Sequence, residues 1–339
     1  MPLSPTAPGP RDADERPALI LANLGTPAEP RPRAVRSFLR EFLSDRRVVE
    51  THPLLWRPVL EGIILRVRPR ASAAKYATVW RPGEETSRSG SPLMHYSERQ
   101  GELLQEELGE SVQVRIAMRY GQPALRRVMG ELMGAGCRRI ALIPLYPQYA
   151  ASSAGTVVDE AARFILASRN QPELRTVRSF ETAPAYIEAL ATALEQHWRV
   201  HGRPDPAAGE RLLLSFHSIP QAMHDAGDPY RAECERTVEL LSQRLNLPDG
   251  LAQLTFQSVF GPAAWIGPAT IDTVGDLGRA GCPRLDVICP GFVSDCLETL
   301  EEINQLNRET FTTAGGGTFH YIPWGNDSDG AIATLAEQA

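Results

Sequence analysis

Residues 211–220 read RLLLSFHSIP, a run of apolar residues that ends abruptly in a histidine, a serine and a proline. A buried parallel strand has this pattern when it delivers a polar group to its carboxyl end. Ligands of open α/β sheets collect outside the carboxyl ends of the strands. His217 therefore lies where chemistry is expected, and imidazoles as a class change charge near neutral pH. A histidine at a strand end is also commonly a hydrogen-bonded packing residue, and this stretch alone leaves both interpretations open.

Strand-like and helix-like segments alternate on both sides of this stretch, and the two halves of the chain share one plan. ALILANLGTP (18–27) matches RLLLSFHSIP as an opening strand closed by a proline, and RRIALIPLYPQYAAS (138–152) matches PRLDVICPGFVSD (283–295) as a late strand. Such alternation implies parallel sheets covered by helices. The predicted fold class is α/β, with two similar Rossmann-like, doubly wound domains and a cleft between them.

The expected domain boundaries follow from composition. A flexible N-terminal tail is expected over 1–16, the first domain over 17–175, the second over 176–325, and a C-terminal tail over 326–339. The second domain carries the His217 strand. G-x-G-x-x-G is absent after the first strand, and G-x-x-x-x-G-K-[ST] occurs nowhere, so the sequence gives no support to a dinucleotide or nucleoside triphosphate site.

Bulk composition excludes several classes of protein. The 339 residues carry a formal net charge of −6, which argues against nucleic acid as a partner because neutralising phosphates requires a basic surface. The five cysteines include no C-x-x-C pair, which favours a reducing, cytoplasmic setting over a disulfide framework or a zinc knuckle. No apolar run approaches the roughly 20 residues needed to span a bilayer.

Residues 53–68, PLLWRPVLEGIILRVR, are more apolar than a solvated helix requires. One interpretation is a helix packed on the core. The other is an apolar lip over a cleft, or a surface (53–65) that makes peripheral contact with a membrane. Arg66, Arg68 and Arg70 follow at once, and a flat hydrophobic ligand with carboxylate tails would suit this combination.

A second group of candidate residues lies at the start of the last long predicted helix, which is expected to begin at Ser294. At 100° per residue, Asp295, Glu298 and Glu302 fall within an arc of about 60°. Acidic residues in a first turn also complement the helix dipole, but that gives no reason for a row two turns deep. An imidazole together with carboxylates suits a first-row divalent ion such as Fe²⁺, and it equally suits removal of protons.

These residues lie within a series of motifs that resembles the ferrochelatase family. The motifs are NLGTP (23–27), FLREFLSDRRVV (38–49), GSPL (90–93), MRYG (118–121), PLYPQY (144–149), SFHSIP (215–220), GDPY (227–230), WIGPAT (265–270) and CPGFVSDCLETLEEI (289–303). The resemblance covers residues 18 to 325. It implies a lyase that inserts Fe²⁺ into protoporphyrin IX, the last step of haem biosynthesis, with iron as substrate.

The resemblance also implies roles for individual residues. The family's essential histidine and glutamate fall on His217 and Glu298, as catalytic and metal-binding groups, and its acidic helix face falls on Asp295 and Glu302, as a conduit for protons or metal. The porphyrin contacts that it implies are Leu24, Arg68, Tyr76, Ser91, Arg119, Tyr120, Tyr146 and Trp265. Leu24 stands where coproporphyrin-using relatives have a tyrosine, which favours protoporphyrin.

Some relatives hold a [2Fe–2S] cluster through cysteines near the carboxyl end, but no cysteine follows Cys296, so no iron–sulfur cluster and no tightly bound cofactor are expected. Two alternatives stay open. A chelatase of the same superfamily could use another metal, such as cobalt, or another tetrapyrrole. A non-catalytic porphyrin or haem carrier would bind without turnover. The oligomeric state has no signature in the sequence.

Overall fold

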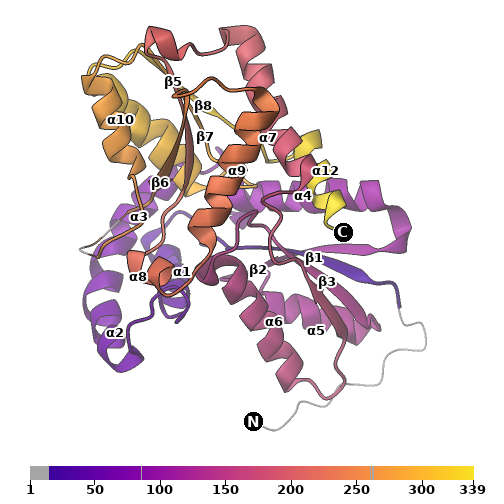
Figure 1. Cartoon of the computed structure of the whole chain (residues 1–339). Helices are drawn as coiled ribbons and strands as arrows, with labels where there is room; N and C mark the ends of the chain where they lie inside the picture. Colours follow the sequence, from indigo (N-terminus) through magenta and orange to yellow (C-terminus); the bar gives the residue numbers. More distant parts are fainter. Residues whose placement is uncertain (1–14, 85, 260, 262) are drawn as a thin grey trace. The chain divides into compact units, whose positions relative to one another are not determined.

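The computed structural model describes residues 15–84, 86–259, 261 and 263–339 (Figure 1). The chain divides into two compact units. Unit 1 extends to Tyr146 and includes Ala150–Ser179 and Gln338–Ala339, whereas unit 2 comprises Pro147–Tyr149 and Phe180–Glu337. Most of the N-terminal tail expected over 1–16 lies outside the described residues.

Unit 1 is built on a four-stranded parallel sheet of order β2-β1-β3-β4. Strand β1 (Ala18–Asn23) is central, and all six of its residues are buried, as expected for a strand with both faces covered. The other strands are β2 (Gln113–Met118), β3 (Arg139–Pro144) and β4 (Glu173–Thr176). The sequence pattern missed β4, because ELRT is a short, polar edge strand.

The helices of unit 1 pack around this sheet, and their shared core includes Ile20, Met129 and Val157. The helical segments are α1 (Pro32–Leu43), α2 (Pro53–Val59), the π-helix η1 (Leu60–Ile64), α3 (Leu65–Val79), η2 (Arg88–Gly90), α4 (Pro92–Leu108), η3 (Gly109–Ser111), α5 (Leu125–Ala135), the π-helix η4 (Ala151–Gly155) and α6 (Thr156–Ala167). A turn follows α1, in which the Val49 amide donates to the Asp45 carbonyl at 2.9 Å.

The apolar segment 53–68 has two different faces. Leu60 and Leu65 are buried against Leu43 in a small core cluster. On the opposite side, apolar side chains are exposed, namely Leu54 (77%), Leu55 (70%), Ile63 (58%) and Val67 (68%). The segment is therefore partly a packed helix and partly an apolar surface. Among the described residues, no helix has the length and apolar character needed to cross a bilayer.

Two motifs of unit 1, NLGTP and MRYG, meet at Gly25. The Tyr120 amide donates to the Leu24 carbonyl at 2.8 Å, and Gly25 has φ +111°. A Cβ atom at Gly25 would lie 1.9 Å from the Tyr120 carbonyl oxygen. This position therefore requires glycine both for its backbone conformation and for the close approach of the two chain segments.

Replacing Gly25 by alanine is expected to destabilise unit 1 by at least about 2 kcal/mol, because backbone strain and overpacking add. Thermal unfolding followed by circular dichroism would measure the loss. Gly62→Ala is a matched control, since a Cβ atom at Gly62 would have no neighbour within 4 Å and the residue lies in a helical segment. Equal melting temperatures for Gly25→Ala and the wild type would contradict this account.

Unit 2 repeats the sheet of unit 1, with four parallel strands in the equivalent order β6-β5-β7-β8. The strands are β5 (Arg211–His217), β6 (Ala252–Gln257), β7 (Arg284–Ile288) and β8 (Thr318–Ile322). Two parallel sheets with flanking helices confirm the predicted α/β class and the similarity of the two halves. Edge strand β8 was not predicted.

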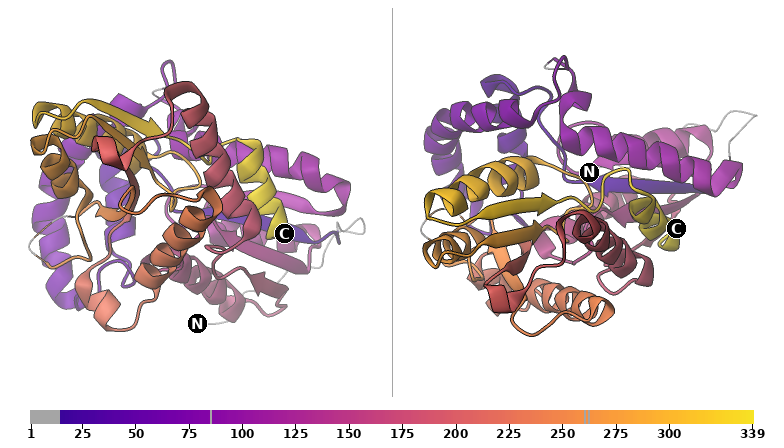
Figure 2. Two further views of the ribbon diagram at one scale, coloured as in Figure 1. Left: turned by 45° about the horizontal axis from the view of Figure 1, so that its top comes forward. Right: turned by 90° about the horizontal axis from the view of Figure 1, so that it is seen from above.

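The helical segments of unit 2 are α7 (Pro184–His201), η5 (Pro206–Ala208), α8 (Gln221–Asp225), α9 (Tyr230–Leu245), α10 (Thr270–Arg279), the π-helix η6 (Glu298–Asn307), α11 (Arg308–Thr313) and α12 (Asp329–Glu337). The residues expected to form a C-terminal tail include helix α12 instead. This helix buries Ala331 and Leu335 and lies beside α7 (Figure 2). The short helix α8 begins directly after Pro220.

Candidate active site

His217 is the last residue of β5, and its side chain is half-buried. Its Nδ1 lies 2.5 Å from the carbonyl oxygen of Ser218. Because a carbonyl can only accept, Nδ1 carries the hydrogen, and Nε2 of the neutral ring keeps its lone pair. The ring is therefore held in the tautomer that offers Nε2 as a base or as a metal ligand.

The loops that follow β5 and β6 are joined next to His217. The Ser218 hydroxyl donates to the Ile266 carbonyl at 2.8 Å, and the Ile266 amide donates to the Ile219 carbonyl at 3.0 Å. Trp265 forms an isolated bridge with Pro220, so the loop that carries this tryptophan is anchored to the His217 loop. Trp265 is half-buried.

Gln257 connects the His217 strand to the last long helix. It is paired with His217 in the β5–β6 ladder, and its Nε2 donates to the backbone carbonyl of Glu298 at 2.8 Å. The Ser215 hydroxyl donates to Gln257 Oε1 at 2.8 Å and fixes the orientation of the amide. Glu298 is thus tied through one side chain to the strand that ends in His217. The sequence interpretation missed Gln257.

The carboxylate-bearing helix begins at Leu297 rather than at Ser294, and η6 has π-helical hydrogen bonding over ten residues. The hydrogen bonds of a π-helix join residues i and i+5, so one turn contains more than four residues. Side chains four residues apart therefore lie almost directly above one another along the helix axis. Glu298 and Glu302 therefore form a column, and both are half-buried. π-Helical turns occur frequently at functional sites.

Glu302 is held by Ser258, the first residue after β6. The Ser258 amide donates to Glu302 Oε1 at 2.7 Å, and its hydroxyl donates to Oε2 at 2.5 Å. The pKa of Glu302 is raised, chiefly by burial. The hydrogen bonds from Ser258 and the interaction with His217 oppose this shift, whereas the charge of Glu298 adds to it. Glu302 therefore interacts electrostatically with both His217 and Glu298.

Asp295 lies just before the helix, in a buried position, and not in the column of carboxylates. Thr299 donates to its Oδ1 at 2.6 Å, Asn326 donates to its Oδ2 at 2.7 Å, and the Tyr321 hydroxyl also donates to Oδ1. The predicted three-residue row is therefore wrong in its geometry, because the helix starts two residues after Asp295.

In unit 1, Arg119 and Tyr120 join a buried network around Asp45. The Tyr120 hydroxyl donates to Asp45 at 3.0 Å, Thr156 donates to it at 2.5 Å, and Arg119 forms an ion pair with it. Burial works to raise the pKa of Asp45, but the hydrogen bond from Thr156 and further donors outweigh it and lower that pKa. Tyr120 has no exposed surface, so the structure gives it an interior role.

The other residues predicted to contact porphyrin in unit 1 are scattered over several elements. Arg68 and Tyr76 are half-buried on α3, Tyr76 has an edge contact with Trp80, and Leu24 is half-buried after β1. Two further predicted contacts are Ser91, which is buried and accepts a hydrogen bond from Thr26 at 2.8 Å, and Tyr146, which packs on the core of unit 1.

The geometry of unit 2 brings together an oriented imidazole, a carboxylate pair and the serine that holds one of the carboxyls. Such an arrangement can accept protons at His217 and pass them to carboxyl groups, and it offers nitrogen and oxygen ligands to a divalent ion. The sequence indicated His217, Glu298 and Glu302. It gave no signal for Ser258, whose backbone lies in the left-handed region with φ +64°.

The chain is similar in sequence to proteins of one known family. The family model described as ferrochelatase matches residues 16–339. A ferrochelatase from Aromatoleum aromaticum is 50% identical over 327 residues, which cover 95% of this chain and 87% of the relative. A ferrochelatase from Dechloromonas aromatica is 49% identical over 325 residues, which cover 95% of this chain and 86% of the relative. A ferrochelatase from Methylobacillus flagellatus is 44% identical over 334 residues, which cover 97% of this chain and 94% of the relative.

Solved structures show the same fold at low identity. SirB from Bacillus subtilis with Fe³⁺ has a TM-score of 0.51 at 15% identity. The match covers 73% of this chain and 90% of the SirB chain. The sirohydrochlorin chelatase SirB from Bacillus subtilis subspecies spizizenii in complex with cobalt has a TM-score of 0.51 at 11% identity. The match covers 94% of this chain and 92% of the SirB chain. At these identities the likeness shows the fold alone.

Proposed function

The chain belongs to the ferrochelatase family, and from this premise we propose that His217, Glu298 and Glu302 carry the metallation of a porphyrin. The activity is that of a ferrochelatase, a metal-chelatase lyase of haem biosynthesis whose substrates are ferrous iron and a porphyrin. The homologues do not favour a chelatase for another metal or a carrier without turnover.

One observation supports this choice of residues above the others. Glu302 interacts electrostatically with His217 and with Glu298, although the three residues come from a strand end and a helix far apart in the chain. Ser258 and Gln257 hold the helix against the strands at this point. A buried carboxyl with a raised pKa that lies close to an imidazole and a second carboxylate is typical of sites that move protons.

Insertion of Fe²⁺ requires two pyrrole N–H bonds to break and two Fe–N bonds to form in their place, besides those of the other two ring nitrogens. In the proposed mechanism His217 Nε2 accepts the two pyrrole protons one after the other, and each is then transferred to the column of Glu298 and Glu302. A carboxyl with a raised pKa is suited to this because it exchanges protons closer to neutral pH. The oxygens of the same column are suitable ligands for incoming Fe²⁺.

We further propose protoporphyrin IX as the porphyrin, on the basis of Leu24 before Gly25. The contacts expected from Arg68, Tyr76, Ser91, Arg119, Tyr146 and Trp265 stay predictions, to be tested by substitution and porphyrin titration. A contact through Tyr120 would require its buried ring to become exposed. Four further expectations also stay predictions: a cytoplasmic location, peripheral membrane contact through 53–65, the lack of a nucleic-acid partner and the lack of an iron–sulfur cluster.

An anaerobic assay of the purified protein with Fe²⁺ tests the proposed substrate. Absorbance changes on metallation should appear with protoporphyrin IX and be faster than with coproporphyrin, and faster with Fe²⁺ than with Co²⁺. A clear preference for coproporphyrin would overturn the substrate proposal while leaving the family activity intact.

Ser258→Ala is expected to move the acidic limb of the pH–rate profile to higher pH. The serine hydrogen bond stabilises the ionised form of Glu302, so its loss raises the pKa of that carboxyl further, and a higher pH is needed to ionise it. The measurement is kcat against pH. In a Glu302→Gln background, where the titrating group is gone, Ser258→Ala should leave the limb unmoved. An unchanged limb in the single variant would count against the role of Glu302.

A further inference from the structure

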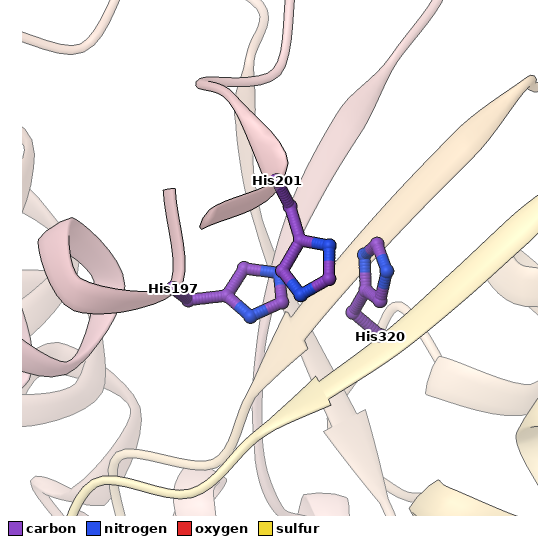
Figure 3. A group of neighbouring side chains, drawn as sticks. All are labelled: His197, His201 and His320. Atoms are coloured by element: carbon purple, nitrogen blue, oxygen red, sulfur yellow. The ribbon is translucent and has the colours of Figure 1, made fainter. Parts of the chain in front are cut away.

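Three histidines of unit 2 lie together at a place that the proposed chemistry does not use. His197 and His201 come from the last turns of α7, and His320 comes from β8 (Figure 3). Their ring centroids are 4.4–4.6 Å apart, and one ligand atom from each lies within 4.8 Å of the others. The i, i+4 spacing places the two helical rings on one face of α7, toward the strand.

The group is far from the proposed active site. Asp286, whose carboxyl contacts His320, pairs with Leu212 in the sheet, five residues before His217 on β5. At a rise of about 3.3 Å per residue, this is roughly 16 Å along the strand, toward the amino end of the sheet. The three histidines therefore form a separate site.

The buried carboxyl of Asp286 orients the cluster. His320 Nδ1 lies 2.9 Å from Asp286 Oδ1, so this nitrogen carries the hydrogen and Nε2 is left with its lone pair. Arg284 donates to both carboxylate oxygens, at 2.9 and 2.8 Å, and Trp198 donates to Oδ2 at 2.8 Å, so Asp286 is itself fixed. A carboxylate that accepts from the second nitrogen of a histidine is the usual support of a metal-ligating imidazole.

The state of His197 points to a ligand. Its Nε2 is buried and makes no hydrogen bond within the described part of the chain, although it lies 3.8 Å from Asp286 Oδ1. The His201 ring stacks on the His197 ring at a centroid distance of 4.4 Å, and His320 lies 4.6 Å away, so two further imidazoles surround this nitrogen-bearing ring. A buried nitrogen without a partner is unfavourable unless something binds it.

We propose that His197, His201 and His320 form a second metal site, for a zinc-like divalent ion, which ties edge strand β8 to α7. Three imidazoles with water in the fourth position are a recognised tetrahedral zinc set. His201 is exposed, so the site opens to solvent and its ring can turn toward the ion. Purely nitrogen ligation favours Cu²⁺ and Zn²⁺ over Fe²⁺, so this site would not compete for the iron substrate.

The test uses full-length protein freed of metal by chelation. Co²⁺, which reports tetrahedral nitrogen ligation by its visible absorbance, is titrated into the wild type and into His201→Ala, His217→Ala and His52→Ala, and Zn²⁺ is then used to displace it. The wild type, His217→Ala and His52→Ala should show the tetrahedral band. His201→Ala, which alters an exposed side chain and should fold normally, should bind at least about 100-fold more weakly.

Thermal unfolding gives a second readout. Zn²⁺ at a hundredfold excess over its Kd should raise the Tm of the wild type by about 5 °C and leave that of His201→Ala unchanged. The same band and the same rise of Tm in His201→Ala, or the loss of both in His217→Ala, would overturn the proposal. Ferrochelatase turnover of His201→Ala should match the wild type.

Discussion

Replacing His217 by alanine is expected to lower kcat for iron insertion by about 10³-fold while porphyrin binding survives. General bases typically contribute 10²–10⁴-fold to a rate. The imidazole at the end of β5 offers Nε2 as the proton acceptor because Nδ1 is committed to the Ser218 carbonyl. The half-buried ring can be removed without opening the core, so the variant should fold. Stopped-flow absorbance under anaerobic conditions measures turnover, and porphyrin fluorescence measures binding.

Added imidazole sharpens this experiment. If the missing group acts as a base or a ligand, free imidazole should restore part of the activity of His217→Ala in proportion to its concentration, with no effect on the wild type. Near-normal turnover of the variant without imidazole would remove His217 from the mechanism. Loss of porphyrin binding in parallel with turnover would assign the residue to substrate binding instead.

Glu298→Gln is expected to lower kcat by about 10²–10³-fold, since it removes a charge from the column without altering its shape. The backbone of Glu298, not its side chain, accepts the hydrogen bond from Gln257, so the helix should stay in place. The charge of Glu298 also contributes to the raised pKa of Glu302. Its removal should lower that pKa, and the acidic limb of the pH–rate profile should move to lower pH.

Glu301→Gln is the matched control, because it neutralises another half-buried glutamate on the same helix. Its kcat and pH–rate profile should stay close to those of the wild type. If Glu298→Gln and Glu301→Gln reduce kcat equally, the effect belongs to the net charge of the helix rather than to the column. Unchanged turnover in Glu298→Gln would refute the assignment.

The sequence predicted the parts of this fold that local pattern determines. Buried parallel strands such as β1 and β5 are continuous apolar runs with distinct ends, and the likeness of the two halves follows from their repeated order. Edge strands β4 and β8 were missed because they are short, and β4 is polar. Helix α12 was missed because its small residues follow a stretch that resembles a tail.

At the candidate site, the sequence identified the reactive groups but not their supports. Periodicity placed Glu298 and Glu302 on one side of a helix, yet it assumed α-helical winding from Ser294, and η6 starts later with wider turns. The contacts of Ser258 and Gln257 depend on which strands are neighbours, and this is determined by tertiary pairing rather than by local sequence. The same is true of the histidine cluster, which joins side chains of α7 to one of β8, far away in the chain.

The backbone of Ser258 has a consequence for the evolution and engineering of this protein. A non-glycine residue with φ +64° is less favourable than a glycine there, by on the order of 1 kcal/mol. Glycine at position 258 would relieve this strain but would also remove the hydroxyl that donates to Glu302, so the two changes in the free energy of unfolding oppose each other. Ser258→Gly should therefore alter the protonation of Glu302 more than it alters stability, and a library screened only for survival at high temperature would give no reliable account of this position.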